Sequence, residues 1–185
     1  MTRVAHAARE IGLFLGRTRR CPRLSALALS TITKLVERAG NFLRKAAARK
    51  PGLYTVLADG DNQDDPVVDT ARSILDGHIV LSRDIAQRGQ YPAIDVGASL
   101  SRVMADITTP EHQVQARQLR GLMASYEANR DLVLMGAYRA GADAQLDRAI
   151  VMQEALTNFL SQGTAERSSI ANSVAALNGL MGDES

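Results

Sequence analysis

Apolar residues recur every three to four positions along most of the chain, which is the spacing of amphipathic helices. This spacing predicts one helix over residues 2–15 and another over residues 25–39. From residue 108 to the C-terminus the pattern is helical throughout. Three apolar stripes mark the helices there: Leu119, Leu122, Met123 and Tyr126; Leu146, Ile150, Met152, Leu156, Phe159 and Leu160; and Ile170, Val174, Leu177 and Leu180.

Short apolar runs between the first helices predict strands. Leu53–Ala58 is rich in residues that suit a pleated surface. Ile79–Leu81 predicts a strand or a packed turn with no solvent face. Between these runs, Asp65 and Pro66 predict the start of a helix that runs to Leu75, because proline is favoured in the first helical turn. Strands that alternate with helices in this way predict an α/β layer with a parallel sheet.

Three local signals predict how the elements begin and end. Gly77 is expected to end the preceding helix by taking the left-handed conformation. Tyr91 precedes Pro92, which favours extended backbone at the tyrosine. Thr108 with Glu111 matches a capping box at the start of the first helix of the C-terminal region.

Composition narrows the class of protein. Hydrophobic residues make up 45% of the 185 residues and aromatic residues only 4%, so the core is expected to be aliphatic. The single cysteine, Cys21, excludes an internal disulfide and fits a reducing compartment. A membrane-spanning helix needs about 18 or more consecutive apolar residues, and the sequence has no such run.

The net charge of +2 conceals a strong asymmetry. Residues 1–50 hold twelve Lys or Arg and two Glu, whereas the remaining residues hold ten basic and eighteen acidic side chains. Taken alone, the basic first part favours nucleic acid, an anionic membrane surface or a transit peptide as its explanation.

No metal site is predicted. The acidic stretch with Asp59, Asp61, Asp64 and Asp65 lacks the Gly and Glu that a calcium loop needs at its sixth and twelfth positions, so a solvated turn is the better interpretation. His78 has no second ligand at metal-binding spacing.

The stretches DGHIVLSR, YPAIDV and ASLSRVM, in that order, resemble the C-terminal part of the export ATPases related to the catalytic subunits of rotary ATP synthases. The resemblance covers about residues 1–16, 26–42 and 52–182. It implies an α/β fold in which residues 1–107 form the C-terminal portion of a RecA-like nucleotide-binding domain, with an incomplete parallel sheet. Residues 108–185 then form an all-α helical domain.

The resemblance also implies the roles of three residues. Arg102, in the Ser-Arg pair, corresponds to an arginine that the family contributes in trans, as an arginine finger, to the nucleotide of the neighbouring subunit. The alternative for this side chain is an ion pair with Asp106, one helical turn later. Phe159 and Gln162 lie in a segment that approaches the adenine in the related ATP synthase subunits, and helix-end packing is the alternative there.

Parts of the family's nucleotide site have no counterpart in the sequence. No GxxxxGK[ST] stretch is present, so the backbone cradle for phosphates is missing. The family's metal-binding aspartate precedes a Thr-Arg pair, but here Thr2 and Arg3 follow only Met1. The intact family uses ATP and Mg²⁺, whereas this chain alone is expected to bind neither tightly and to be inactive by itself.

The function implied is that of a C-terminal fragment of a flagellar export ATPase, a motor that energises type III protein export. Intact members are expected to form homohexamers and to meet stalk and regulator proteins, chaperone–substrate complexes and the membrane export gate. Nucleic acid is not an expected partner. Their place is cytoplasmic and peripheral to the inner face of the bacterial membrane. The flagellar branch is favoured by Asn129–Leu132, Gly136–Tyr138 and the stretch FLSQGTAERSS.

Several alternatives remain open. The chain could be a fragment of a type III secretion (injectisome) ATPase, a non-enzymatic interaction module, or a nucleic-acid binder that uses its basic part. It could also be an inert pseudogene product, in which Leu53–Ala58 and Ile79–Leu81 lie uncovered. Residues 17–24 and 43–51 depart from the family pattern. The hypothesis for these two windows is that they are short out-of-frame stretches, and a real basic loop is the alternative.

Overall fold

The computed structural model describes residues 1–14, 26–37, 40–41, 49–50, 52–58 and 65–182. Most of the two off-pattern windows, and most of the acidic stretch, lie outside these residues. The chain divides into two compact units, Met1–Asp76 and Gly77–Ser185, and each is described by itself. The predicted domain boundary near residue 108 concerns a different division of the chain and stays a prediction.

The first unit is built mainly from three helices: α1 (Thr2–Phe14), α2 (Ala26–Glu37) and α3 (Pro66–Ile74). A short antiparallel pair, β1 (Gly40–Asn41) with β2 (Arg49–Lys50), lies between α2 and α3 in the sequence. Helix α2 contacts both α1 and α3. The core consists of buried Ala5, Ile32 and Val67, one from each helix, with Met1 and Val56 packed against them.

Helix α3 begins where the sequence predicts. The Asp65 side chain accepts hydrogen bonds from the backbone N–H groups of Val67 at 2.7 Å and Val68 at 3.4 Å. Pro66 occupies the first turn, where it removes no helical hydrogen bond. The start of this helix is therefore set by local chemistry alone.

The strand predicted at Leu53–Ala58 is wrong, because these residues do not form a sheet ladder. Their backbone groups bond to the start of α1 instead. The Met1 N-terminal amine donates to the Thr55 carbonyl at 2.8 Å. Leu57 N–H donates to the Thr2 hydroxyl oxygen at 2.8 Å. With no strand alongside, Leu53 is 99% exposed and Leu57 is 75% exposed.

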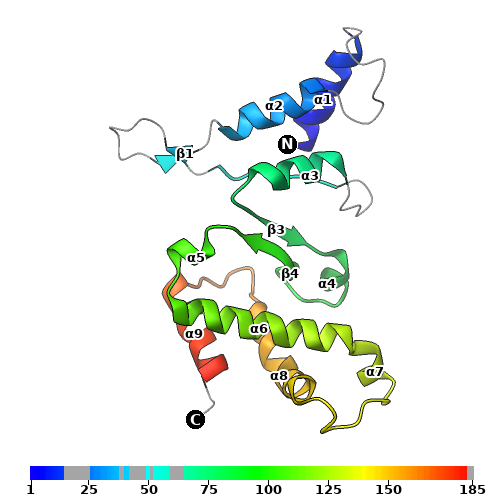
Figure 1. The fold of residues 1–185 in the computed structure, drawn as a ribbon, viewed down its shortest axis with the longest axis vertical. Coiled ribbons are helices and arrows are strands. Elements are labelled where there is room, and N and C mark those ends of the chain that lie inside the picture. The colour runs from blue at the N-terminus through cyan, green and yellow to red at the C-terminus, as the bar shows by residue number, and fades with distance from the viewer. Residues whose placement is uncertain (15–25, 38–39, 42–48, 51, 59–64, 183–185) are drawn as a thin grey trace. The chain divides into compact units, whose positions relative to one another are not determined.

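The second unit begins with a hairpin and continues into helices (Figure 1). Strand β3 (Gly77–Leu81) is followed by α4 (Arg83–Gln87), β4 (Ile94–Ser101) and α5 (Met104–Ile107). The remaining helices are α6 (Pro110–Ala128), α7 (Arg130–Leu134), α8 (Ala144–Leu160) and α9 (Ile170–Gly182). Strands β3 and β4 pair antiparallel. Parallel pairing, which strand–helix alternation predicts, is thus absent from the strand pairs that the structure describes.

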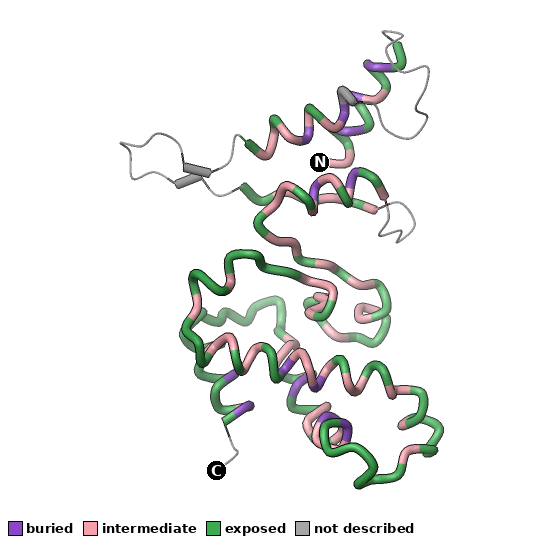
Figure 2. Tube along the Cα trace, in the orientation of Figure 1, coloured by how far each residue is buried: buried purple, intermediate pink, exposed green. Residues whose placement is uncertain are grey.

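The core of the second unit lies between α6, α8 and α9. Its buried members, purple in Figure 2, are Leu119, Leu122, Ala149, Leu156, Leu177 and Met181. Leu119, Leu122, Leu156 and Leu177 belong to the stripes predicted from helical spacing. Partly buried side chains surround them, including Val96 from β4 and Phe159 from α8. The core therefore joins the helices to the hairpin, through a strand residue.

The explanation predicted for Gly77 is wrong. Helix α3 ends at Ile74, its C-cap Leu75 has extended backbone, and Gly77 lies inside β3 without a positive φ. Glycine is needed there for space, because a Cβ at Gly77 would come within 2.5 Å of the Leu100 carbonyl oxygen. Its small size thus allows the end of β4 to approach β3 closely.

The capping box predicted from Thr108 and Glu111 at α6 is wrong, because the N-cap lies one residue later. Thr109 is the N-cap, and its hydroxyl oxygen accepts from His112 N–H at 3.3 Å. The Thr108 hydroxyl instead donates to the Met104 carbonyl at 2.6 Å, at the end of α5. Backbone hydrogen bonding at Glu111, followed by the hydrogen bond from the Thr109 side chain, lowers the pKa of Glu111. Two adjacent threonines thus serve two different helices.

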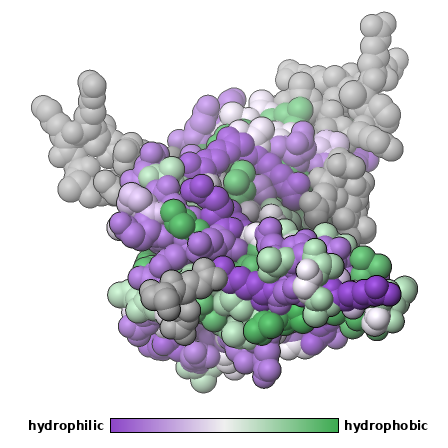
Figure 3. Space-filling model, turned by 60° about the horizontal axis from the view of Figure 1, so that its bottom comes forward, coloured by the Kyte–Doolittle hydropathy of each residue, from purple (hydrophilic) through white to green (hydrophobic). Residues whose placement is uncertain are grey.

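The expectation that Ile79–Leu81 has no solvent face is also wrong. Ile79 is 70% exposed and Leu81 is 72% exposed, because β4 pairs along one edge of β3 and no described layer covers these two side chains. Figure 3 shows hydrophobic residues interspersed with hydrophilic ones on the visible surface. No helix in the described part of the chain is long and apolar enough to cross a membrane.

Replacing Leu156 by alanine should destabilise the protein by about 2–5 kcal/mol, because the side chain is buried in the α6–α8–α9 core and its loss leaves a cavity. Urea unfolding followed by circular dichroism measures this change. Val151, on the same helix, is 82% exposed, and Val151→Ala should change stability by less than about 0.5 kcal/mol. Equal effects of the two substitutions would contradict the placement of this core.

Candidate functional site

Arg102 lies at the junction between β4 and α5. It follows Ser101, the last residue of β4, and comes two residues before α5 begins at Met104. Its side chain is exposed, as are those of its neighbours Ser101 and Val103. A cation at this point follows the end of a paired strand and is exposed to solvent. The ion pair with Asp106, the alternative for this arginine, stays a prediction.

The strand that carries Arg102 contains an irregularity. His78 pairs with Leu100 and Val80 pairs with Asp95, so residues 96–99 of β4 lie opposite a single residue of β3. We call residues 96–99 the β4 insert. Such bulges bend a strand and change the direction of the side chains that follow. The path of the chain into Arg102 therefore depends on how this insert is held.

Hydrogen bonds hold the β4 insert at several points. An Asp95 carboxylate oxygen accepts from Ala98 N–H at 2.9 Å. The Ser99 hydroxyl donates to the Asp95 carbonyl at 2.5 Å and accepts from Val80 N–H, on the facing strand, at 3.0 Å. The His78 ring nitrogen Nε2 lies 3.2 Å from the Ala98 carbonyl oxygen.

The two residues predicted to lie near adenine have different environments. Phe159 is partly buried and packs against the α6–α8–α9 core. Gln162 is exposed, and its backbone N–H donates to the Tyr91 carbonyl at 2.8 Å. Its side-chain amide donates to the Glu166 carbonyl at 3.2 Å. The structure thus brings Gln162 next to Tyr91, and the adenine-side role of Phe159 and Gln162 stays a prediction.

Tyr91 is a candidate residue that the sequence reasoning did not include. Its side chain is 57% exposed, and its carbonyl is held by Gln162, which follows the end of α8. An exposed aromatic ring offers a flat face on which a base can stack. The signal that could have found it is an aromatic residue in the Tyr-Pro stretch, which the sequence interpretation used only for backbone conformation.

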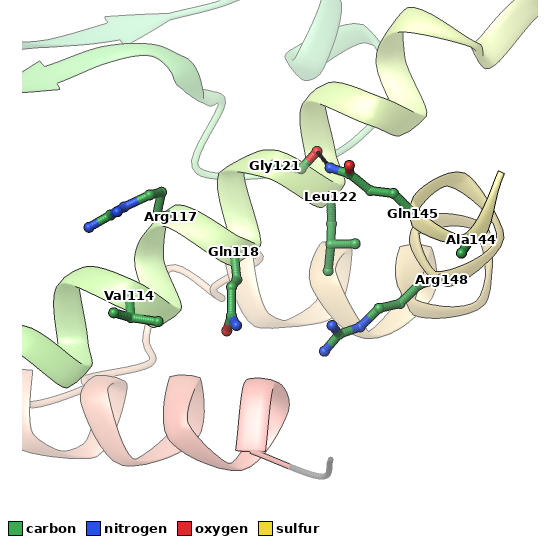
Figure 4. A pocket seen from close by; sticks show the side chains of 8 residues that line it. All are labelled: Val114, Arg117, Gln118, Gly121, Leu122, Ala144, Gln145 and Arg148. Carbon is green, nitrogen blue, oxygen red and sulfur yellow. Dashed lines mark hydrogen bonds between the residues drawn. The ribbon is translucent and has the colours of Figure 1, made fainter.

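A groove of about 560 Å³ lies on the helices of the second unit (Figure 4). Helix α6 contributes Val114, Arg117, Gln118, Gly121 and Leu122, and α8 contributes Ala144, Gln145 and Arg148. Gln118, Leu122 and Arg148 point toward a common space, whereas Arg117 extends away from them. The Gln145 amide donates to the Gly121 carbonyl at 3.3 Å. The lining contains two cations and no carboxylate, which suits an anionic group.

The connection between α7 and α8 is organised by a tyrosine and two aspartates. The Tyr138 hydroxyl donates to the Asp147 carboxylate at 2.9 Å and accepts from Asp143 N–H at 3.2 Å. Asp147 also accepts from Gly141 N–H at 2.8 Å, and Asp143 caps α8 through Gln145 N–H at 2.8 Å. Sequence reasoning used Gly136–Tyr138 only as a sign of the flagellar branch and did not predict these contacts. The aspartates were detectable as polar residues at a helix start.

The described residues contain no group of three His, Cys, Asp or Glu side chains that could hold a metal ion. Residues 59–64 of the acidic stretch lie outside the described part of the chain, and this statement does not extend to them.

Two family models match the chain, and together they cover nearly all of it. Residues 1–101 match the nucleotide-binding domain of the ATP synthase alpha/beta family. Residues 108–179 match the C-terminal domain of the type III secretion ATPase EscN. The chain belongs to the ATP synthase alpha/beta family.

Within this family, the chain is similar to export ATPases. It is 45% identical to the flagellum-specific ATP synthase of Salmonella typhimurium over 96% of this chain. It is 41% identical to the flagellum-specific ATP synthase of Bacillus subtilis over 100% of this chain. It is 44% identical to a type 3 secretion system ATPase of Pseudomonas syringae over 90% of the chain. The chain spans 36–41% of the length of these three relatives.

Solved structures support the same assignment. The assembled ATPase EscN of the enteropathogenic E. coli type III secretion system superposes with a TM-score of 0.87 at 38% identity, over 96% of this chain and 42% of EscN. EscN in complex with its central stalk EscO gives a TM-score of 0.83 at 37% identity, over 97% of this chain and 42% of that one. The predicted class, an α/β nucleotide-binding portion followed by a helical module, is confirmed.

The Tyr138 contacts predict a dependence of stability on pH. Desolvation, followed by the hydrogen bond to Asp147, raises the pKa of Tyr138, so the folded state favours the protonated phenol. The stabilisation should be complete below a pH of about 10, the ordinary pKa of tyrosine, and should be lost as the pH rises through the raised pKa. Tyr138→Phe should therefore lower the urea midpoint at pH 8 and differ less from the unmodified protein at pH 11. Tyr126→Phe is the control, and a Tyr138→Phe effect that is equal at both pH values would refute the link.

Proposed function

We propose that this chain is part of an ATP-hydrolysing motor that energises flagellar type III protein export. In this proposal Arg102 acts as an arginine finger on ATP bound by a neighbouring subunit. The observation that carries it is the place of Arg102, exposed directly after β4, in a chain that resembles flagellum-specific ATP synthases along nearly its whole length. EscN is an assembled ATPase in one of the solved structures and is in complex with its central stalk EscO in another, which supports a ring and a stalk partner here too.

The chemistry assigned to Arg102 is electrostatic. Phosphoryl transfer spreads negative charge over the transferred group, and a guanidinium placed against it stabilises the transition state more than the ground state. Arginine suits this role because it stays charged and presents a planar set of donors. The chain's own residues do not fit a bound nucleotide and metal, since the sequence has no phosphate loop and the described residues hold no metal-ligand cluster. No step is therefore assigned to a nucleotide bound by this chain.

The remaining partners follow from the same proposal. We infer a homohexameric ring, contact with stalk or regulator proteins, delivery of chaperone–substrate complexes, and a peripheral place on the cytoplasmic face of the membrane beside the export gate. The injectisome branch is the first alternative, because the type 3 secretion system ATPase of Pseudomonas syringae is 44% identical, close to the flagellar relatives. A non-enzymatic interaction module is the second, and the groove with Arg117 and Arg148 favours it.

A mixed-ring assay tests the arginine finger. The Salmonella typhimurium relative is prepared with alanine in place of its own arginine at the aligned position, and the purified chain is added. Stimulation of ATP hydrolysis is expected, because an arginine finger supplied in trans raises the rate by about 10³–10⁵-fold. Even if only part of the chain joins the ring, the increase in rate should be measurable. Arg102→Ala should abolish the stimulation, whereas Arg167→Ala, at an exposed arginine between α8 and α9, should retain it. Stimulation that survives Arg102→Ala would refute the proposed role.

Nucleotide binding by the chain alone provides a separate test. Without a phosphate loop the chain should bind no ATP in the high-micromolar range, with or without Mg²⁺, in isothermal titration calorimetry. The relative serves as the positive control under the same conditions. Binding by the chain in this range would favour a nucleotide site that is not built from the family's phosphate loop.

A further inference from the structure

We propose that Asp95 and Ser99 are positioning residues for Arg102. They hold the β4 insert in one conformation, so that the strand delivers the arginine at a fixed place. This inference rests on the proposed role of Arg102, which it deepens by naming the residues that make the role possible.

Ser99 is the central contact of the insert. Its hydroxyl donates to the Asp95 carbonyl at 2.5 Å, which closes the insert at its base, and accepts from Val80 N–H at 3.0 Å. One side chain thereby bonds both to its own strand and to the facing strand. Val80 N–H would otherwise point at a stretch of β4 whose backbone has moved out of register. The Ser99 hydroxyl takes the place of the missing bond between the strands. Without it, the Val80 N–H would have no hydrogen-bond acceptor.

Asp95 fixes the interior of the insert. Its carboxylate accepts from Ala98 N–H at 2.9 Å, in the manner of aspartates that stabilise turns. The Ala98 carbonyl on the same peptide chain lies 3.2 Å from the His78 ring, across the hairpin. The middle of the insert is therefore held by Asp95, directly before the insert, and by His78 of β3.

Val96 attaches the insert to the helices. This residue of the insert packs against the α6–α8–α9 core, whose buried members include Leu122 and Leu156. Burial of this apolar side chain stabilises the protein, so the packing favours the placement of the insert in which Val96 is covered. The insert is thus held by the helical core on one side and by β3 on another.

The end of β4 is equally constrained. Ser101, directly before Arg102, pairs with Gly77, and Leu100 pairs with His78. The absence of a side chain at Gly77 permits this close approach. Between the insert and Arg102 the chain therefore has no free residue that could absorb a change in the insert, and a loosened insert should shift the arginine.

Such control matters for a side chain that acts on a neighbouring subunit. A displacement of about 1 Å at a reacting group can cost a large part of the rate. A long arginine side chain also needs a rigid base, because its own rotamers add further freedom. Residues that fix the base of Arg102 should consequently affect catalysis without touching the nucleotide.

Relaxation measurements by NMR on the full chain test the holding of the insert. Backbone order parameters for residues 96–102 should be about 0.85 in the unmodified protein and fall below about 0.6 in Ser99→Ala and in Asp95→Ala. Asp95→Asn keeps an acceptor oxygen for Ala98 N–H and should restore the higher values. Ser101→Ala is the matched control, since it changes a serine of the same strand outside the insert. Unchanged signals from α6 and α8 would show that each variant folds.

The mixed-ring assay then connects the insert with catalysis. Ser99→Ala and Asp95→Ala should reduce the stimulation at least about tenfold without changing the concentration of chain needed for half of it, whereas Ser101→Ala and Asp95→Asn should stimulate normally. If order parameters and stimulation are unchanged in Ser99→Ala and Asp95→Ala, the positioning inference is wrong and the proposed function stands. If the unmodified chain does not stimulate at all, it is the proposed function that fails. Loosening of the insert with full stimulation also overturns the inference.

Discussion

The packing of Val96 into the core formed by α6, α8 and α9 is the interaction on which the second unit depends. Polar contacts add to it, such as the 2.8 Å hydrogen bond from Gln162 N–H to Tyr91 and the exposed Arg88–Glu127 pair at 3.7 Å. Ion pairs of this exposed kind contribute little to stability. An apolar side chain from a strand thus helps to join the hairpin to the helices.

Helices were predictable from the sequence because their signals are local. The spacing of Leu146 and Leu156 places both on the buried face of α8, and Asp65 starts α3 with its own side chain. The stretch Leu53–Ala58 misled the prediction because strand propensity says nothing about whether a pairing partner lies alongside. Likewise, the reason for a glycine at Gly77 is the nearness of Leu100, which is far enough along the chain to be invisible to local reasoning.

The candidate site divides in the same way. The position of Arg102 before a new helix was predictable from the residues around it, and the resemblance supplied the role to be tested. The β4 insert was not predictable, since Gly97, Ala98 and Ser99 read as a small-residue stretch without periodicity. Their arrangement depends on a register shift against β3, and a shift of register is a property of two strands together.

The proposed role of Arg102 is consistent with the elements that the chain has and those that it lacks. A nucleotide site of its own would require a phosphate loop, which the sequence lacks, whereas an arginine that serves a neighbour requires only a rigid base and an exposed end. In the described residues, Ser99 bonds β4 to β3, Val96 packs β4 against the helical core, and Arg102 follows the strand in an exposed position. In the proposed function, the elements that place Arg102 are therefore different from those that would hold ATP.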